Sequence, residues 1–222
     1  MDIALFTSGG LDYLARWGHL LAGTTWIGLL YYFNFVQGEY FKEAEDAHRS
    51  GAVQKLVPRA LWWFRWGAMF TFLTGVAMLG YRQGAVTLDI TLGATMGTLM
   101  FLNVWLIIWP NQKIVIASAT QVAQGGAALP EAAGAGPKAG LASRTNTLFS
   151  IPMLFFMGAS AHMPTSLIGS ASMVAVVVSM VIIFAIEANG IFGKQGPMTT
   201  VRGVIGCGFG LTAVLYGVVA LL

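Results

Sequence analysis

Charged residues are scarce in this sequence. Of its 222 residues only 9% are Asp, Glu, Lys or Arg, whereas 56% are hydrophobic and the mean hydropathy is +0.71. A soluble globular domain has about a quarter of its residues charged. The composition therefore excludes an ordinary soluble domain and indicates an integral membrane protein in a lipid bilayer. In such a chain a formal net charge of +3 reports topology, so we expect no nucleic-acid partner.

Motifs for common enzyme classes are also missing. The single cysteine, Cys207, excludes an internal disulfide, and there is no C-x-x-C-H for covalent haem attachment. The sequence has no H-E-x-x-H, no G-x-S-x-G and no glycine-rich phosphate loop. These absences exclude typical zinc proteases, serine hydrolases and nucleotide-binding enzymes.

Long apolar runs are what the sequence does have. A helix needs about 20 apolar residues to cross the hydrocarbon core of a bilayer. We therefore expect an all-α integral membrane protein, a single domain over residues 1–222 with about six transmembrane helices. The predicted spans are 11–36, 60–81, 89–110, 145–166, 168–190 and 200–222.

Two connections between the predicted spans are long. Residues 38–60 are charged and favour a surface helix. Residues 113–144 are rich in Ala and Gly; their first part extends the third helix, and the "GGAALPEAAGAGPKAG" part predicts a flexible loop. Pro110 in "IIWPNQK" is expected to mark the exit of the third span from the membrane.

The basic residues predict the orientation. The side of the first, third and fifth connections holds ten of them, whereas the opposite side has only Arg16 and Arg82. The positive-inside rule then places both termini on the outer side, and we expect the membrane to be a bacterial inner membrane. The ten are Lys42, Arg49, Lys55, Arg59, Arg65, Lys113, Lys138, Arg144, Lys194 and Arg202.

Two histidines fall in the outer half of this topology. His19 lies about two turns from the outer end of the first span, and His162 lies close to the outer end of the fourth. Gly23 and Gly158 are each four residues deeper, so each histidine has a gap beside it on its own helix face. A flat macrocycle between two helices needs such gaps. The pattern predicts a haem b whose iron is held by His19 and His162.

Haem propionates need cations near the membrane surface. Arg16 shares a helix face with His19, and Arg82 ends the second span, so both are candidates to bind them. Trp26 and Phe33 continue the His19 face and are expected to wall the site. The alternative is that each intramembrane histidine only hydrogen-bonds a carbonyl or hydroxyl of a neighbouring helix.

Further polar residues lie in the spans. Arg65 stands among tryptophans in "WWFRWGAMF", a pattern typical either of an interfacial aromatic belt or of a clamp for a planar or anionic ligand. Glu187, at a similar depth, is a candidate ion-pair partner of Arg65. Asn103 is expected to cross-link helices.

Four stretches resemble one known family. In order they are "RWGHLLAGTTWIG", "WWFRWGAMFTFLTG", "FLNVWLIIWPNQK" and "SIPMLFFMGASAHMP". They resemble the membrane domain of the cytochrome-linked integral membrane urate oxidase (urate hydroxylase) family. The resemblance implies a helical domain that oxidises a small molecule and passes electrons to cytochrome c. The site residues it implies are His19, Trp26, Trp63, Arg65, Trp66, Asn103, Asn111, Gln112 and His162.

These observations together predict a haem b-binding electron-transfer protein. The cytochrome c that the family carries at its C-terminus is absent from this sequence, so we expect a separate cytochrome c or a larger redox complex as the partner. One alternative is an oxidoreductase for urate or another small planar substrate, bound by Arg65, Trp63, Trp66, Asn103, Asn111 and Gln112. Another is a cofactor-free accessory subunit of a respiratory or photosynthetic complex.

Overall fold

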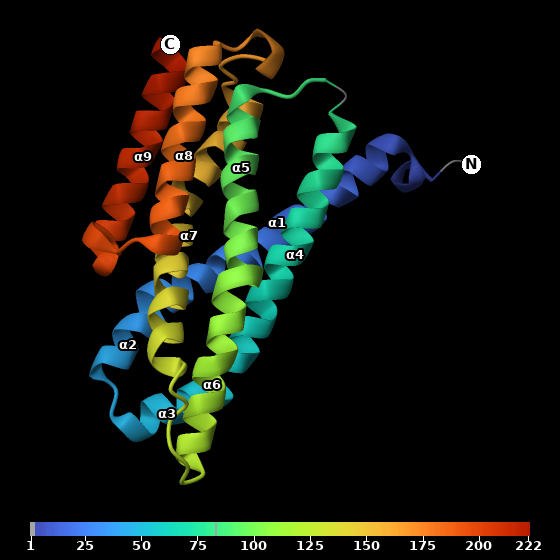
Figure 1. The fold of residues 1–222 in the computed structure, drawn as a ribbon. Coiled ribbons are helices and arrows are strands. Elements are labelled where there is room, and N and C mark those ends of the chain that lie inside the picture. The colour runs from blue at the N-terminus through green and yellow to red at the C-terminus, as the bar shows by residue number, and fades with distance from the viewer. Residues whose placement is uncertain (1–2, 83) are drawn as a thin grey trace.

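The structure is a computed structural model that describes residues 3–82 and 84–222. In this part of the chain every named element is a helix, and the isolated bridge between Thr87 and Leu167 is its one extended pairing. η2 and η3 are π-helical, and η1, η4 and η5 are 3₁₀ turns. The order (Figure 1) is η1 Ala4–Phe6, α1 Ser8–Tyr31, η2 Tyr32–Gln37, α2 Gly38–Glu43, α3 Asp46–Lys55, α4 Val57–Tyr81, α5 Leu88–Leu102, η3 Asn103–Ile108, α6 Trp109–Ala123, α7 Ala132–His162, η4 Ile168–Ser170, α8 Met173–Phe192, η5 Gly196–Thr199 and α9 Val201–Leu221.

Each predicted apolar segment lies largely within a long helix. The third segment belongs to α5, η3 and α6, which together form one continuous helix, Leu88–Ala123. Three helices in the described part of the chain are long and apolar enough to cross a membrane: Leu88–Ala123, Met173–Phe192 and Val201–Leu221. The all-α membrane class is therefore confirmed, whereas the number of six spans and the orientation of the termini stay predictions.

Serine and threonine side chains fix where four of the helices begin. Each of these residues precedes the first helical turn and accepts a hydrogen bond from the backbone N–H three residues further on, which would otherwise lack a partner. The capping residues are Thr7 for α1, Thr87 for α5, Ser172 for α8 and Thr200 for α9.

The prediction of a flexible loop over residues 125–140 is wrong from Ala132 onward. α6 ends at Ala123, a short turn follows, and α7 already begins at Ala132. The turn is held by the Leu129 N–H, which donates to Ser118 Oγ over 3.0 Å. Alanine has the highest helix propensity, and its small side chain lets α7 pack closely against α6. Residues Ala135, Ala139 and Ala142 are accordingly buried.

The third helix continues through Pro110, in line with the predicted extension of this helix beyond its span. Pro110 is the second residue of α6, and Trp109 separates it from η3. Proline lacks the N–H that an α-helix needs, and the wider π-helical turn before it relieves the mismatch. The Asn111 side chain donates to the Ile107 carbonyl over 2.7 Å and so gives that carbonyl a hydrogen-bond partner next to the proline.

The charged connection at 38–60 forms the two short surface helices α2 and α3, as predicted, and neither has a buried residue. Between the fourth and fifth segments the chain leaves the helix at His162 and re-enters it at Met173. This connection is longer than predicted. It pairs with the start of α5, since the Leu88 N–H donates to the Ser166 carbonyl over 3.0 Å.

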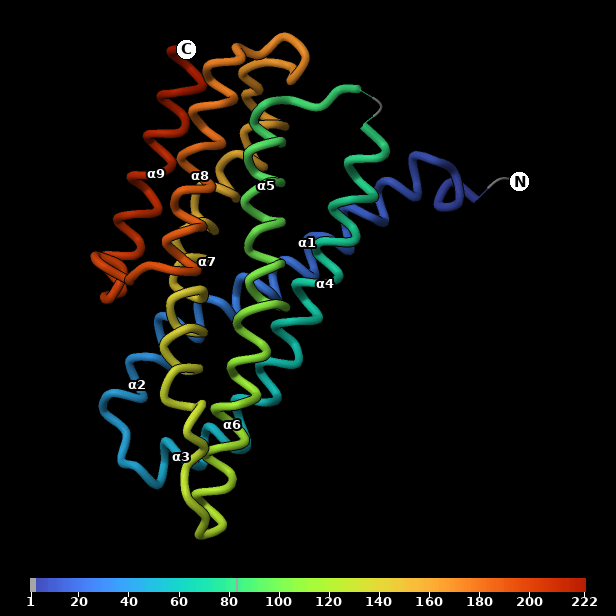
Figure 2. Tube along the Cα trace, in the orientation of Figure 1, coloured from blue at the N-terminus to red at the C-terminus, as the bar shows by residue number. Residues whose placement is uncertain are grey.

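α7 is the central helix of the larger group of helices. An added Cβ at Gly93 of α5, Gly208 of α9 or Gly190 of α8 would lie within 3.0 Å of an α7 side chain. α1 and α4 form a separate antiparallel pair. Figures 1 and 2 show this pair diverging from α5 towards the end of the bundle where α4 terminates.

The outer faces of the helices are apolar. On α8, residues spaced by three and four positions share one face, as helix geometry requires. Their side chains are all more than half exposed, and the face fits lipid rather than water. These residues are Val174, Val177, Val181 and Phe184.

Candidate functional site

His19 lies on α1 against α4 and is half-buried. Its Nδ1 is 3.2 Å from Thr74 Oγ1. A Cβ at Gly75 would lie 3.2 Å from His19 Cε1, so this glycine leaves room for the ring. The predicted hydrogen bond from this histidine to a neighbouring helix is therefore present, and its partner is Thr74.

The hydrogen bonds of the Thr74 hydroxyl favour one tautomer of His19. Thr74 Oγ1 lies 2.6 Å from the Phe70 carbonyl and 3.1 Å from the Thr71 carbonyl, and it can donate its one proton to either. With that proton on a carbonyl, the hydroxyl accepts from Nδ1, and Nε2 of a neutral ring keeps its lone pair. Histidine metal ligands usually have this arrangement, with the second ring nitrogen donating to the protein.

His162 is the last residue of α7, and its side chain is exposed. Two residues earlier, Ser160 Oγ accepts hydrogen bonds from Arg82 Nη1 and Thr87 Oγ1, both over 2.9 Å. Nothing lies within 4 Å of the Cβ that could be built at Gly158. The structure thus places Arg82 near the His162 end of α7 and leaves open space beside Gly158.

The remaining residues predicted around a haem are more dispersed. Arg16 is about half exposed and its Nε donates to Asp12 Oδ2 over 2.8 Å. A Cβ at Gly23 would lie 3.8 Å from Thr71 Cγ2, so α4 covers that glycine. Trp26 is buried between α1 and α4, where its backbone contacts Gly67.

α1 and η2 are hydrogen-bonded to α7 about three turns away from His19. Tyr31 Oη lies 2.9 Å from Ser150 Oγ, and Asn34 Nδ2 donates to Ser143 Oγ over 2.8 Å. Among the hydrogen bonds of the described residues, none joins His19 to His162. That part of the chain also holds no group of three or more His, Cys, Asp or Glu placed to bind a metal ion.

Arg65 stacks on the third helix instead of pairing with a carboxylate. Its guanidinium carbon lies 3.8 Å from the centroid of the Trp109 ring. The predicted Arg65–Glu187 ion pair is wrong: over residues 3–82 and 84–222, Arg65 forms no salt bridge, because the Trp109 ring covers it. Trp63 is 60% exposed, and Trp66 packs edge-on against Trp105.

Asn103 cross-links three helices, as predicted. Its Nδ2 donates to Asn146 Oδ1 of α7 over 2.9 Å and to Glu187 Oε2 of α8 over 3.1 Å. Asn146 in turn donates to the Met100 carbonyl over 2.9 Å. All three side chains are buried, so this network replaces water for the Glu187 carboxylate.

A polar cavity of about 300 Å³ lies at the basic end of the bundle. The π-helical η2 and the end of η3 both contribute to it, and π-helical turns often mark functional sites. Of the residues predicted to bind substrate, Gln112 lines this cavity, whereas Asn111 bonds its own helix. The lining residues include Phe33, Asn34, Gln37, Lys42, Phe64, Ile108, Ser143, Arg144, Gln195 and Thr199.

Arg144 is a site residue that the sequence pattern does not single out. It falls in the predicted connection between the third and fourth spans, where it is one basic residue among several. The structure shows its side chain only 8% exposed, on the wall of the cavity. An arginine directly before the apolar run "TNTLFSIPMLFF" is the signal that could have indicated a buried position.

Comparison with known families gives one match. The sequence profile of a family described as urate oxidase N-terminal matches residues 82–205, a little over half of the chain. The matched region runs from the end of α4 into α9; it contains Arg82, Asn103, Gln112, Arg144 and His162, and His19 lies outside it. No curated protein and no solved structure matches the chain.

Proposed function

Because this chain belongs to the urate oxidase N-terminal family, we propose that it is a haem b-binding membrane protein that transfers electrons. Its partner is a separate cytochrome c or a larger redox complex. The observation that carries the proposal is the contact between His19 and Thr74. With Nδ1 donating to the Thr74 hydroxyl, Nε2 of the neutral imidazole would bind iron.

For haem binding, His19 and His162 would supply the two imidazoles, and Arg82, which donates to Ser160 near the end of α7, would supply the cation for a propionate. Arg16 is the second basic residue on that side. A haem held by two imidazoles would serve electron transfer rather than oxygen activation. Thr74 would orient the ring of His19, and the apolar helices would cover the macrocycle.

The proposal includes six spans with both termini on the outer side of a bacterial inner membrane. The distribution of basic residues supports this orientation. It places His19 and His162 in the outer half, where a soluble cytochrome c can approach.

The test is a visible absorption spectrum of the detergent-purified chain before and after dithionite. We expect a reduced-minus-oxidised spectrum of b type, lost in His19→Ala and in His162→Ala. His48→Ala is the matched control, because His48 is an exposed histidine on α3. A colourless wild-type protein would overturn the proposal and favour the cofactor-free accessory subunit. Low-spin haem retained in either alanine variant would overturn the pair of ligands.

A second candidate function is the oxidation of urate or another small planar substrate. The cavity that Gln112 lines favours this function, because its volume of about 300 Å³ is large enough for one small ligand. Each oxidised urate would deliver two electrons, so two molecules of added cytochrome c would be reduced for each urate consumed. Haem that urate does not reduce under anaerobic conditions would leave electron transfer as the function.

A further inference from the structure

We propose that the cavity beside Arg144 binds an anionic oxygen group, a carboxylate or a phosphate, carried by a small molecule or by a lipid headgroup. The proposal concerns binding alone. It depends neither on the haem nor on oxidation of the bound molecule.

Arg144 is the residue that points to an anion. It is 8% exposed and lines the cavity, and its Nη1 is buried without a hydrogen-bond partner among the described residues. Burying a guanidinium is costly unless acceptors replace its water. A carboxylate or phosphate matches the planar fork of arginine with two parallel hydrogen bonds. An anionic group in the cavity would supply the missing acceptor.

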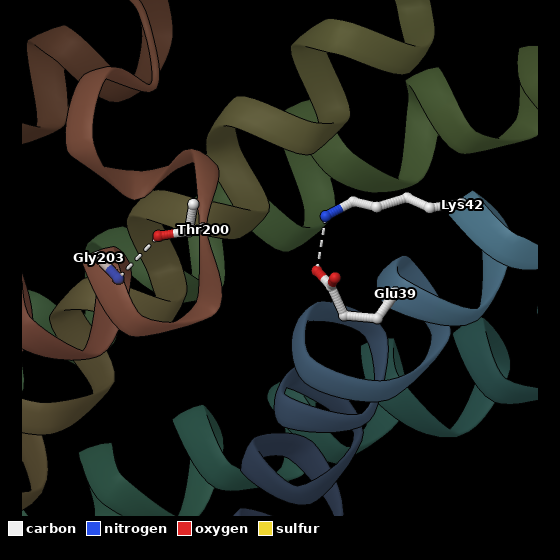
Figure 3. Close-up of polar contacts among 4 residues, drawn as sticks. All are labelled: Glu39, Lys42, Thr200 and Gly203. Carbon is white, nitrogen blue, oxygen red and sulfur yellow. Dashed lines mark hydrogen bonds and ion pairs between the residues drawn. The ribbon is translucent and has the colours of Figure 1, made fainter.

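No carboxylate of the described residues occupies Arg144, so its guanidinium is available to an anionic ligand. Glu39 is the carboxylate whose charge acts on Arg144. However, Glu39 Oε1 already accepts from Lys42 Nζ over 2.8 Å (Figure 3), and no salt bridge joins Glu39 to Arg144 in the part of the chain that the structure describes. Lys42 also lines the cavity, and its charge is balanced by Glu39, so Arg144 is the cation there without a paired carboxylate among the described residues.

The other walls indicate what accompanies the anionic group. Gln37 Oε1 is buried and has no hydrogen-bond partner among the described residues, so it can accept a hydrogen bond from the ligand. Gln112 adds a second amide. Phe33 and Phe64 pack edge to face, with ring centroids 5.5 Å apart, and give one apolar wall. The volume of about 300 Å³ suits one small molecule or one headgroup.

The test uses the full-length protein in a zwitterionic detergent, with inorganic phosphate as the probe and chloride at equal ionic strength as the reference. We expect phosphate to raise the thermal unfolding midpoint in a saturable way. Arg144→Gln should weaken this binding at least about tenfold, since it removes a charged hydrogen bond. The phosphate affinity of Arg144→Lys should lie between those of the wild type and Arg144→Gln, because lysine keeps the charge but lacks the planar guanidinium with its paired donors. Arg202→Gln, at an exposed arginine of α9, is the matched control and should bind as wild type.

A second measurement distinguishes the two sources of the anion and covers a variant that does not fold. Native mass spectrometry after exchange into phosphatidylglycerol or phosphatidylcholine nanodiscs shows whether a lipid is retained. If the wild-type protein retains phosphatidylglycerol, and both added phosphate and the Arg144→Lys change remove it, the ligand is a lipid headgroup. If the protein binds phosphate but retains no phosphatidylglycerol, the ligand is a free anion.

Equal binding of phosphate by Arg144→Lys and Arg202→Gln would overturn the proposal, as would a wild-type protein that binds neither probe. Neither readout uses the haem spectrum. A protein that binds haem but not phosphate would therefore refute the anion site and leave the proposed electron transfer standing. A colourless protein that binds phosphate would refute the electron transfer and leave the anion site standing.

Discussion

At the scale of single residues, Thr74 is the positioning residue for His19. Replacing it with valine keeps the shape and removes the hydroxyl that accepts from Nδ1. We expect Thr74→Val to retain less haem during purification and to shift the reduced absorption bands, because the ring of His19 loses its fixed tautomer. The loss in unfolding free energy should be small, about 0.5–1.5 kcal/mol.

Thr74→Ser keeps the hydroxyl and is the control. It should show the wild-type spectrum and haem content. A Thr74→Val protein with unchanged haem content and spectrum would contradict the role of Thr74, even if its thermal midpoint fell, since a purely structural contact would change the midpoint alone.

Two asparagines on the same continuous helix differ in what they hold together. Asn103 bonds Asn146 and Glu187 on two other helices, whereas the Asn111 side chain bonds only the Ile107 carbonyl of its own helix. We expect Asn103→Leu to lower the unfolding free energy by about 1–3 kcal/mol, because it leaves a buried amide and carboxylate without a donor. Asn111→Leu should cost about 1 kcal/mol or less. Denaturation of the two variants side by side in the same detergent checks this, and equal losses would contradict the cross-linking role.

At the scale of elements, hydrophobicity alone located the long helices. A run of about 20 apolar residues has one stable solution in a bilayer, a helix whose backbone groups bond internally. The start of α7 could not be predicted in this way. Residues 132–144 are mostly Ala and Gly, with no large apolar residues at helical spacing, and their helix is stabilised by the burial of Ala135, Ala139 and Ala142. Tertiary packing, which the sequence does not display, decides that segment.

The packing of α8 on α7 depends on Gly190. A Cβ there would lie 2.7 Å from Thr145 Oγ1 and 3.0 Å from Thr145 Cβ. Thr145 is fully buried and β-branched, so it cannot turn away. We expect Gly190→Ala to lower the unfolding free energy by about 1–3 kcal/mol. Gly206→Ala on α9, where nothing lies within 4 Å of an added Cβ, should be neutral or stabilising by up to about 1 kcal/mol. Thermal unfolding of both variants measures the difference, and a stable Gly190→Ala protein would show that α8 packs differently.

At the scale of the whole molecule, the candidate site is only partly predictable because its residues come from distant segments. The sequence identifies His19 by its rarity in an apolar run, but Thr74, 55 positions further on, becomes its partner only when α1 and α4 pair. The cavity combines η2, α2, α4, η3, α6, α7 and the connection before α9. No local pattern joins these segments, so it is the fold that brings Arg144 and Gln37 to one cavity.

The topology is the last property of the whole molecule, and cysteine labelling tests it. Three predicted spans separate Ala47 on α3 from Ser170 on η4, so the two positions should lie on opposite sides of the membrane. Both side chains are exposed, and Cys207→Ser gives a background without thiols. We expect a membrane-impermeant maleimide to label Ser170→Cys in bacterial cells whose outer membrane alone is permeabilised, and Ala47→Cys only after the inner membrane is broken. The reverse pattern would keep the number of spans and place His19 in the cytoplasmic half, out of reach of a periplasmic cytochrome c. Labelling of both positions from one side would require an even number of crossings between them, and one of α4, the α5–α6 helix and α7 would then not cross the membrane.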